Sequence, residues 1–338
     1  MKRDAFFDNA KLILIFFVVF GHMIQPFTDG SRSMYTLYTW IYTFHMPAFI
    51  FLAGFFAKGS GNKDYILKLA KKLILPYLIF QIVYTGYFFF IGKDGWMNGM
   101  FYPHWSLWFL FSLFSWHILL YGFKKIPPLL SMAIAVEIGI VVGYVSDIGH
   151  SFSLSRTFVF FPFFLAGYWL TKDHVQKWRT RRVREISLVI MGITAAVIAM
   201  FPEFSSGWLL GSKSYAVLGN PELGGIFRIG VYALAAIMTI SVLSWVPSRE
   251  FSITYLGRKT LYVYLLHGFF IQYFREADLF KVNTVFDVIG LGVLSALIVY
   301  LLSSRPIQIF TQPLIEGKAY LIKEKWNRWT KKDSTLPS

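Results

Sequence analysis

The chain has 338 residues, of which 56% are hydrophobic, 20% aromatic and only 15% charged, and its mean hydropathy is +0.53. This balance leaves too little polar surface for a soluble globule, so it excludes an ordinary water-soluble domain and predicts an all-α polytopic membrane protein. Cysteine is absent, which excludes disulfides, thiolate metal sites and a cysteine acyl-enzyme.

Apolar stretches of about 16 to 24 residues, separated by polar loops, predict about ten transmembrane helices. The first stretch is too long, and too polar at its end, for a cleaved signal peptide. We therefore expect a ten-helix membrane domain over 1–304 and a basic cytoplasmic tail over 305–338. The predicted spans lie near residues 10–27, 35–57, 70–92, 105–123, 128–146, 156–171, 186–201, 224–246, 258–275 and 284–303.

The net charge of +15 fits membrane topology better than nucleic-acid binding. Most of the 33 Lys and Arg residues lie in alternate segments, including the predicted loop "KWRTRRVRE". The positive-inside rule therefore places both termini in the cytoplasm of a multi-pass cell-membrane protein. No nucleic-acid-binding module is recognisable, and the basic excess is expected to contact the lipid bilayer. The terminal "EKWNRWTKKDSTLPS" is expected to form an amphipathic stretch followed by disorder.

Polar residues share one face of the first span. In "DNAKLILIFFVVFGHMIQPF", residues 8–27, Lys11 and His22 are eleven residues apart, within about 20° of three full helical turns. Asp8 falls on nearly the same face, and His22 lies roughly 16 Å deeper than Lys11. An isolated histidine is often a core residue bonded to a neighbouring helix, but the aligned lysine favours a functional stripe.

Further ionisable and aromatic residues at membrane depth are candidates for the same site. Lys68, Lys71 and Lys72 enter the third span, either as ordinary inner-face lysines or as a phosphate-binding cluster beside Lys11. Glu137 could orient an imidazole or pair with Arg228, and both alternatives stay open. The other possible pocket residues are His45, in a span that Pro47 is expected to kink and Gly54 to pack closely, together with Trp108, Arg156 and His267.

The stripe suits a long cytoplasmic donor with an anionic head. Lys11 could hold its phosphates at the inner mouth while a thin arm reaches His22, and the pantetheine arm of acyl-CoA is of about this length. An imidazole can take a proton from an attacking hydroxyl or carry the acyl group covalently. A proton-coupled transporter or flippase, with the intramembrane groups as a relay, is the main alternative. A membrane scaffold or sensor gives no reason for such deep charges.

The residues resemble bacterial acyltransferase family 3, and in particular its fucose 4-O-acetylase-like branch. The resemblance runs along nearly the whole chain through "FFDNAKLILIFFVVFGHM", "FHMPAFIFLAGFF", "KKLILPY", "SLWFLFSLF", "FFPFFLAGYWL" and "LGRKTLYVYLLHG". The family pattern of an arginine, ten intervening residues and an essential histidine matches His22. Lys11 stands where the family has the arginine, which keeps the charge but loses the planar fork. A family arginine pair resembles Lys68, Lys71 and Lys72.

The resemblance implies an O-acyltransferase that moves an acyl group, with acetyl favoured, from cytoplasmic acyl-CoA to a sugar hydroxyl. The acceptor would be a cell-envelope or exported glycan, or a lipid-linked sugar. Acyl-CoA would be a co-substrate, and neither a bound cofactor nor a metal is expected. Some family members carry an extracytoplasmic hydrolase-like domain, which we do not find here. We therefore expect direct acylation or hand-over to a separate extracytoplasmic transferase.

Overall fold

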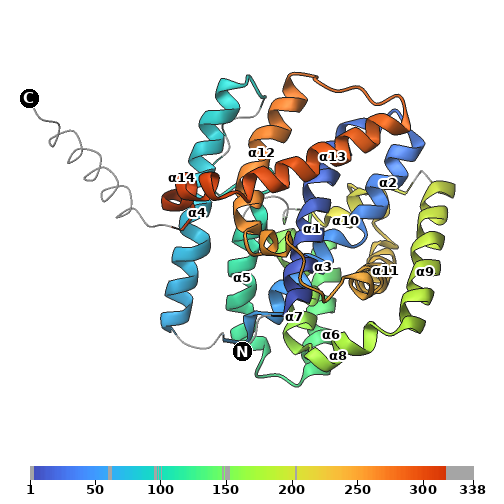
Figure 1. Cartoon of the computed structure of the whole chain (residues 1–338). Helices are drawn as coiled ribbons and strands as arrows, with labels where there is room; N and C mark the ends of the chain where they lie inside the picture. Colours follow the sequence, from blue (N-terminus) through green and yellow to red (C-terminus); the bar gives the residue numbers. More distant parts are fainter. Residues whose placement is uncertain are drawn as a thin grey trace, which may run out of the picture.

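The computed structural model describes residues 4–59, 63–94, 101–146, 153–201 and 204–316, and also residues 97, 99 and 148. Within these residues the chain is helical and contains no strand (Figure 1), which confirms the all-α prediction. The longer helices are α1 (Ala5–Ile24), α2 (Arg32–Tyr42), α3 (His45–Phe55), α4 (Lys63–Phe90), α5 (Trp108–Phe123), α6 (Pro128–Val141), α7 (Leu154–Trp169), α9 (Arg181–Met200), α11 (Gly224–Trp245), α12 (Thr260–Glu276), α13 (Val285–Leu302) and α14 (Arg305–Ile315). The shorter ones are η1 (Gln25–Phe27), η2 (Ala57–Gly59), η3 (Val142–Tyr144), α8 (Lys172–Trp178), α10 (Gly207–Leu210) and η5 (Thr254–Arg258).

Each predicted span coincides with helical structure in the described residues. Five helical segments of the described residues are long and apolar enough to cross a membrane: Ala5–Phe27, Asp64–Phe90, Arg181–Met200, Gly224–Trp245 and Val285–Leu302. Two further apolar helices, Trp108–Phe123 and Pro128–Tyr144, are shorter than a typical span. The total of about ten crossings and the cytoplasmic location of the termini stay predictions.

The second predicted span, 35–57, is two helices and not one. α2 ends at Tyr42, and α3 begins at His45 after a turn in which the Thr43 hydroxyl donates to the Trp40 carbonyl at 2.6 Å. The break places Pro47 in the first turn of α3, where its missing N–H needs no helical partner. The distortion we expected at Pro47 is therefore a full break a few residues earlier, and it sets His45 at a helix start.

Close helix contacts around α3 depend on glycine. A side chain at Gly54 would meet the Phe164 carbonyl of α7 at 1.9 Å, and one at Gly167 would meet the Phe51 carbonyl of α3 at the same distance. The two backbones therefore touch reciprocally, as small residues allow between membrane helices. This confirms the close packing expected at Gly54.

Helix α1 runs through the middle of the bundle, where it contacts α3, α12, α13 and η5 (Figure 1). Its residues Leu14, Ile15 and Val19 are at most 1% exposed. Because α1 is enclosed on several sides, its polar residues must face cavities, polar partners or neighbouring helices rather than lipid.

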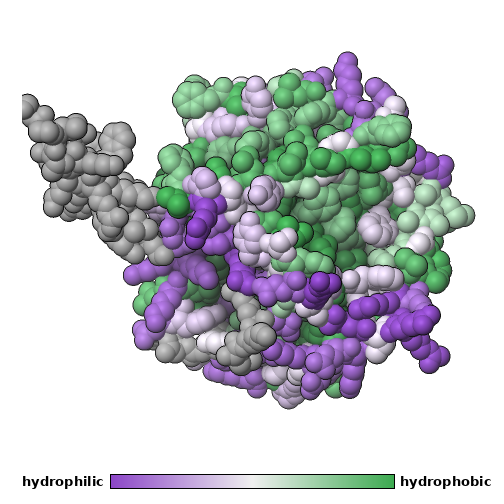
Figure 2. All heavy atoms as spheres, viewed as in Figure 1, coloured by the Kyte–Doolittle hydropathy of each residue, from purple (hydrophilic) through white to green (hydrophobic). Residues whose placement is uncertain are grey.

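The surface is divided between apolar and hydrophilic regions. In the view of Figure 2, apolar residues cover the upper part, over α12 and α13, and hydrophilic residues gather toward the end that holds the N-terminus. Exposed side chains such as Ile193 on α9 and Val293 on α13 belong to the apolar surface. An apolar surface of this kind is what a helical protein presents to lipid hydrocarbon.

The first part of the predicted tail packs on the membrane domain. Helix α14 lies against α4, α12 and α13, and the Tyr262 hydroxyl bonds Glu316 at 2.6 Å. The sequence "EKWNRWTKKDSTLPS" lies outside the described residues. The described structure therefore continues without a break beyond the domain boundary that we expected at residue 304.

Candidate functional site

The first turns of α1 are fixed by η5 and the segment before it. The Asn9 amide donates to the carbonyls of Pro247 and Arg249, both at 2.9 Å, and its oxygen accepts from the Thr254 hydroxyl at 2.7 Å. Both residues of the "DN" pair in "FFDNAK" are nearly fully buried. The polar start of α1 is thus anchored by side-chain bonds that set the position of Lys11.

Asp8 forms ion pairs with Lys11 and with η5. Its carboxylate is 2.7 Å from the Lys11 Nζ atom and 3.1 Å from the Arg258 Nε atom, and the residue is 2% exposed. A carboxylate buried between two cations is a positioning group, because each cation compensates its loss of water. Asp8 therefore orients Lys11 and does not itself line the cavity beside it.

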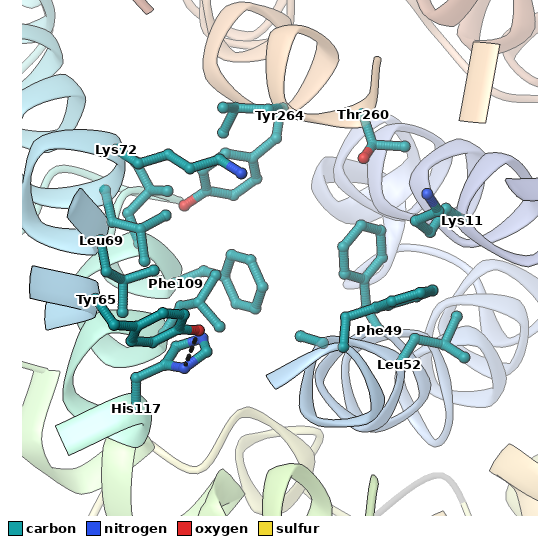
Figure 3. A pocket seen from close by; sticks show the side chains of 16 residues that line it. Lys11, Phe49, Leu52, Tyr65, Leu69, Lys72, Phe109, His117, Thr260 and Tyr264 are labelled. Atoms are coloured by element: carbon teal, nitrogen blue, oxygen red, sulfur yellow. Dashed lines mark hydrogen bonds between the residues drawn. The ribbon is translucent and has the colours of Figure 1, made fainter. Parts of the chain in front are cut away.

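The Lys11 chamber is a cavity of about 310 Å³ between α1, α3, α4, α5 and α12. Figure 3 shows Lys72 and Tyr65 on one side of it and Lys11 and Thr260 on the other. Most of its wall is apolar and aromatic. The chamber therefore has two ammonium groups on opposite walls and an apolar interior, which suits a molecule with an anionic head and a less polar arm.

The predicted lysine cluster is divided by the structure. All three lysines are exposed, but only Lys72 is among the residues that line the Lys11 chamber. A histidine that we did not place in the site, His117, does line it, and its Nδ1 atom is 3.2 Å from the Tyr65 hydroxyl (Figure 3). Of the three lysines only Lys72 lines the cavity, although the spacing i, i+3, i+4 puts all three near one face of α4.

The His22 chamber is a second cavity, of about 230 Å³, at the other end of α1. Four predicted residues meet in its wall, although they come from four different helices. The wall also includes Leu209 from α10, a short helix in the segment between α9 and α11. The four predicted residues are His22 of α1, His45 of α3, Trp108 of α5 and Arg156 of α7.

Aromatic and imidazole rings surround His22. The Trp105 ring lies 4.5 Å from the His22 ring, and the His267 ring lies 5.7 Å away, measured between centroids. The Tyr42 hydroxyl is 3.4 Å from the His22 Nδ1 atom. His267 is fully buried behind this wall and does not itself line the chamber. From the sequence we expected His267 as a possible pocket residue, and the structure places its ring near His22 but behind the residues that line the chamber.

Hydrogen bonds define how the two supporting histidines are protonated. The Nδ1 atom of His45 is 3.0 Å from the Ile41 carbonyl, and that of His267 is 2.7 Å from the Tyr264 carbonyl. A carbonyl only accepts, so each Nδ1 carries the hydrogen and each Nε2 keeps a lone pair. The His267 Nε2 atom is buried and finds no hydrogen-bond partner among the described residues. Acceptor nitrogens of this kind are suited to receive a proton.

A narrow space, called the neck below, lies between the two chambers. It is a space of about 30 Å³ that shares Phe49, Phe109 and Tyr264 with the Lys11 chamber. It shares His22 and Trp108 with the His22 chamber. The three spaces therefore follow the same face of α1 from Lys11 to His22, a rise of roughly 16 Å.

Sequence reasoning missed both Arg275 and Trp105. Arg275 lines the His22 chamber and donates to the His22 carbonyl and, at 2.8 Å, to the Gln25 side chain. Trp105 has a φ of 41°, and a side chain at Gly268 would lie 2.7 Å from its ring. Strained backbone and close packing of this type concentrate at functional sites. The sequence did contain one signal for Arg275: it is a charged residue about two helical turns after His267 on the same helix.

Glu137 does not join the site. It is exposed on α6 and is not among the residues that line either chamber. Arg228, its suggested partner, is 2% exposed and donates instead to the Trp208 carbonyl at 2.7 Å. In the part of the chain that the structure describes, no group of three His, Asp or Glu residues is arranged to hold a metal ion.

The sequence matches the family model of the acyltransferase 3 domain, described as an acyltransferase domain, over residues 4–304. The chain belongs to this acyltransferase family. It is 24% identical to the nodulation protein NolL of Sinorhizobium fredii over 310 residues, covering 85% of this chain and 82% of the relative. It is 34% identical to NolL of Mesorhizobium japonicum over 84 residues, covering 23% and 22% of the two chains. No solved structure matches.

Family membership makes the protein a membrane acyltransferase and confirms the resemblance found in the sequence. The matched range begins before Lys11 and ends after Arg275, so it contains both chambers. An acyltransferase needs a place for the acyl donor, a place for the acceptor and a base or nucleophile between them. The two chambers and the His22 imidazole are the candidates for these three places.

Proposed function

We propose that this acyltransferase moves an acetyl or similar short acyl group from cytoplasmic acyl-CoA to a sugar hydroxyl of a cell-envelope or exported glycan. The observation that carries this proposal is the series of cavities along α1, from the ammonium groups of Lys11 and Lys72 to the imidazole of His22. The donor's phosphates bind at the Lys11 chamber, and its pantetheine arm passes the neck. The thioester carbonyl then lies beside His22.

In the reaction the acceptor hydroxyl oxygen attacks the thioester carbon, and His22 takes the hydroxyl proton. The new carbon–oxygen bond forms as the carbon–sulfur bond breaks, and the proton passes to the departing CoA sulfur. An acyl-histidine on the way divides the same transfer into two steps with the same balance. The aromatic rings of Trp105 and Trp108 offer flat surfaces on which a sugar ring can stack.

The proposed topology follows from the same arrangement. Lys11 and both chain termini are cytoplasmic, where acyl-CoA is made, and the His22 chamber opens toward the outside of the cell membrane. A lipid-linked sugar or a growing glycan then meets the acyl group there, directly or through a separate extracytoplasmic transferase. The protein acts as a catalyst with acyl-CoA as its co-substrate.

The test is transfer in sealed membrane vesicles that carry the protein and the envelope glycans of its host. Acetyl-CoA is supplied on the cytoplasmic face, and the glycans are then analysed by mass spectrometry. We expect ester-linked acetyl groups only when both protein and acetyl-CoA are present. Glycans that gain no acyl group while the vesicles take up a solute in a proton-dependent way would instead identify a transporter.

A further inference from the structure

The His22 chamber carries two positive charges that its own wall does not balance. Arg156 and Arg275 both line it, and no Asp or Glu is among the described residues that form its wall. The nearest acidic residue to Arg275 in the chain, Glu276, is bonded to Lys93 at 2.6 Å. Asp278 lines the neighbouring cavity on the far side of Arg275 and forms no ion pair with it in the described structure.

Arg156 is the freer of the two arginines. Its guanidinium carbon lies 5.0 Å from the centre of the Trp108 ring. It forms no hydrogen bond or ion pair with the residues that the structure describes. A guanidinium has five N–H donors, so this side chain presents a complete set to whatever enters the chamber.

Arg275 is partly used by the protein and partly available. One Nη atom donates to Gln25 and to the His22 carbonyl, while the buried Nε atom has no partner among the described residues. Its guanidinium carbon lies 5.8 Å from the Trp105 ring. Arg275 therefore both positions the end of α1 and retains a donor for a ligand.

An unbalanced pair of half-buried guanidiniums is unfavourable unless an anion joins it. The donor's phosphates do not fill this role, because Lys11 and Lys72 hold them at the other end of α1, roughly 16 Å away. The remaining reactant is the acceptor. Guanidinium forks recognise carboxylate and phosphate groups through paired, charge-assisted hydrogen bonds.

We propose that the acceptor is an anionic sugar, whose phosphate or carboxylate group is held by Arg156 and Arg275 while Trp105 and Trp108 contact its ring. This inference rests on the proposed acyl transfer, and it narrows the acceptor to acidic or phosphorylated glycans. The anionic group fixes the sugar so that one of its hydroxyls faces His22.

The test measures binding to the purified full-length protein in lipid nanodiscs without any acyl donor. The probes are glucose 1-phosphate, glucuronic acid and glucose, which share a ring but carry a phosphate, a carboxylate or no charge. We expect at least one anionic probe to bind about tenfold or more tightly than glucose, the order set by charged hydrogen bonds. The stronger of the two anions identifies the anionic group.

Variants decide whether the chamber is responsible. Arg156→Gln should abolish the preference for the anionic probe, and Arg156→Lys should restore part of it because the charge returns without the fork. Arg181→Gln is the matched control, since this arginine is 93% exposed at the start of α9. Equal binding of all three probes, no saturable binding, or an unchanged preference in Arg156→Gln each overturn the inference.

Consumption of acetyl-CoA is measured separately in the same preparation. Absence of an anion preference in the parent protein, with acetyl transfer to a glycan intact, rejects the anionic acceptor and leaves the proposed function standing. Absence of acetyl transfer to any glycan rejects the proposed function whatever the probes show.

Discussion

The Lys11 chamber and the His22 chamber lie on one face of the same helix and differ in their polar groups. The Lys11 chamber has the ammonium groups of Lys11 and Lys72 at its walls, on long flexible stems. The His22 chamber has two guanidiniums, two lining imidazoles and a cluster of indole rings. Ammonium groups act as adaptable point charges, whereas guanidinium and indole groups fix orientation.

The difference teaches where the protein needs geometry. A phosphate-rich head group that only has to be held tolerates loose point-charge contacts. A reacting hydroxyl and a thioester carbon must be aligned to within a fraction of an ångström. Under the proposed function, Lys11, which stands where the resemblance expects an arginine, lies in the chamber where a point charge is sufficient, and the two arginines line the chamber where orientation matters more.

The largest effect is expected at His22. His22→Ala should lower the rate of acyl transfer by roughly 10²- to 10⁴-fold, because it removes the one imidazole that, among the described residues, lines both the neck and the His22 chamber. Binding of CoA, measured by calorimetry on the purified protein, should change little because the Lys11 chamber is intact. His174→Ala is the control, since His174 only caps α8 on the surface. Near-normal transfer in His22→Ala would show that the acyl group is not transferred at His22, and the proposed difference in role between the Lys11 chamber and the His22 chamber would be wrong.

The neck provides the second test. Its space of about 30 Å³ holds little more than one water, so the side chains there, including the flexible Met46, must change rotamer as the arm passes. Val18→Phe adds a ring to this wall and should reduce transfer by about 100-fold or more. It should leave both CoA binding and anionic-probe binding within about threefold of the parent, because each chamber keeps its own wall.

Val18→Ala is the companion variant, since it widens the same point without adding bulk. It should retain transfer, apart from a modest loss of thermal stability for a smaller buried side chain. If Val18→Phe transfers acyl groups at the parent rate, the arm takes another path and the two chambers are not connected through the neck.

A smaller effect is expected within the Lys11 chamber. Lys72→Ala should raise the KM for acetyl-CoA about tenfold with kcat nearly unchanged, because one charged contact to phosphate is lost. Lys68→Ala should leave KM within about twofold, since Lys68 is exposed and outside the lining residues. Steady-state kinetics on both variants compare two lysines of one predicted cluster. Equal effects would show that the phosphates bind outside the chamber.

Local periodicity was enough to predict the parts of the site that lie on one helix. The alignment of Lys11 with His22 follows from helix geometry alone, and both residues line cavities on α1. The helical segments could also be predicted, because the hydropathy of a stretch depends only on its own residues. From the sequence we expected a kink at Pro47, whereas the helix breaks after Tyr42. The reason is that Pro47 fits in the first turn of α3, so the chain bends in the turn before that helix.

The parts that depend on packing between distant helices were not predictable from spacing. Arg275 reaches the His22 carbonyl across 253 positions of sequence, and no local pattern encodes that contact. Trp105 was not among the predicted site residues, and a tryptophan at the start of a span is commonly an interfacial anchor. Its left-handed backbone and its contact with Gly268 exist only in the folded state.

Glu137 shows the opposite error, and it gives the smallest expected effect. A carboxylate deep in an apolar stretch suggested a partner, but the residue is exposed on α6, away from both chambers. Glu137→Gln should therefore leave the transfer rate, the KM for acetyl-CoA and the anion preference within about twofold of the parent, as surface substitutions usually do. Its melting temperature should stay equal or rise, because a charge is removed from an apolar surface. A clear loss of transfer at normal expression would show that Glu137 acts on the reacting groups. The description of the site as two chambers without Glu137 would then be wrong.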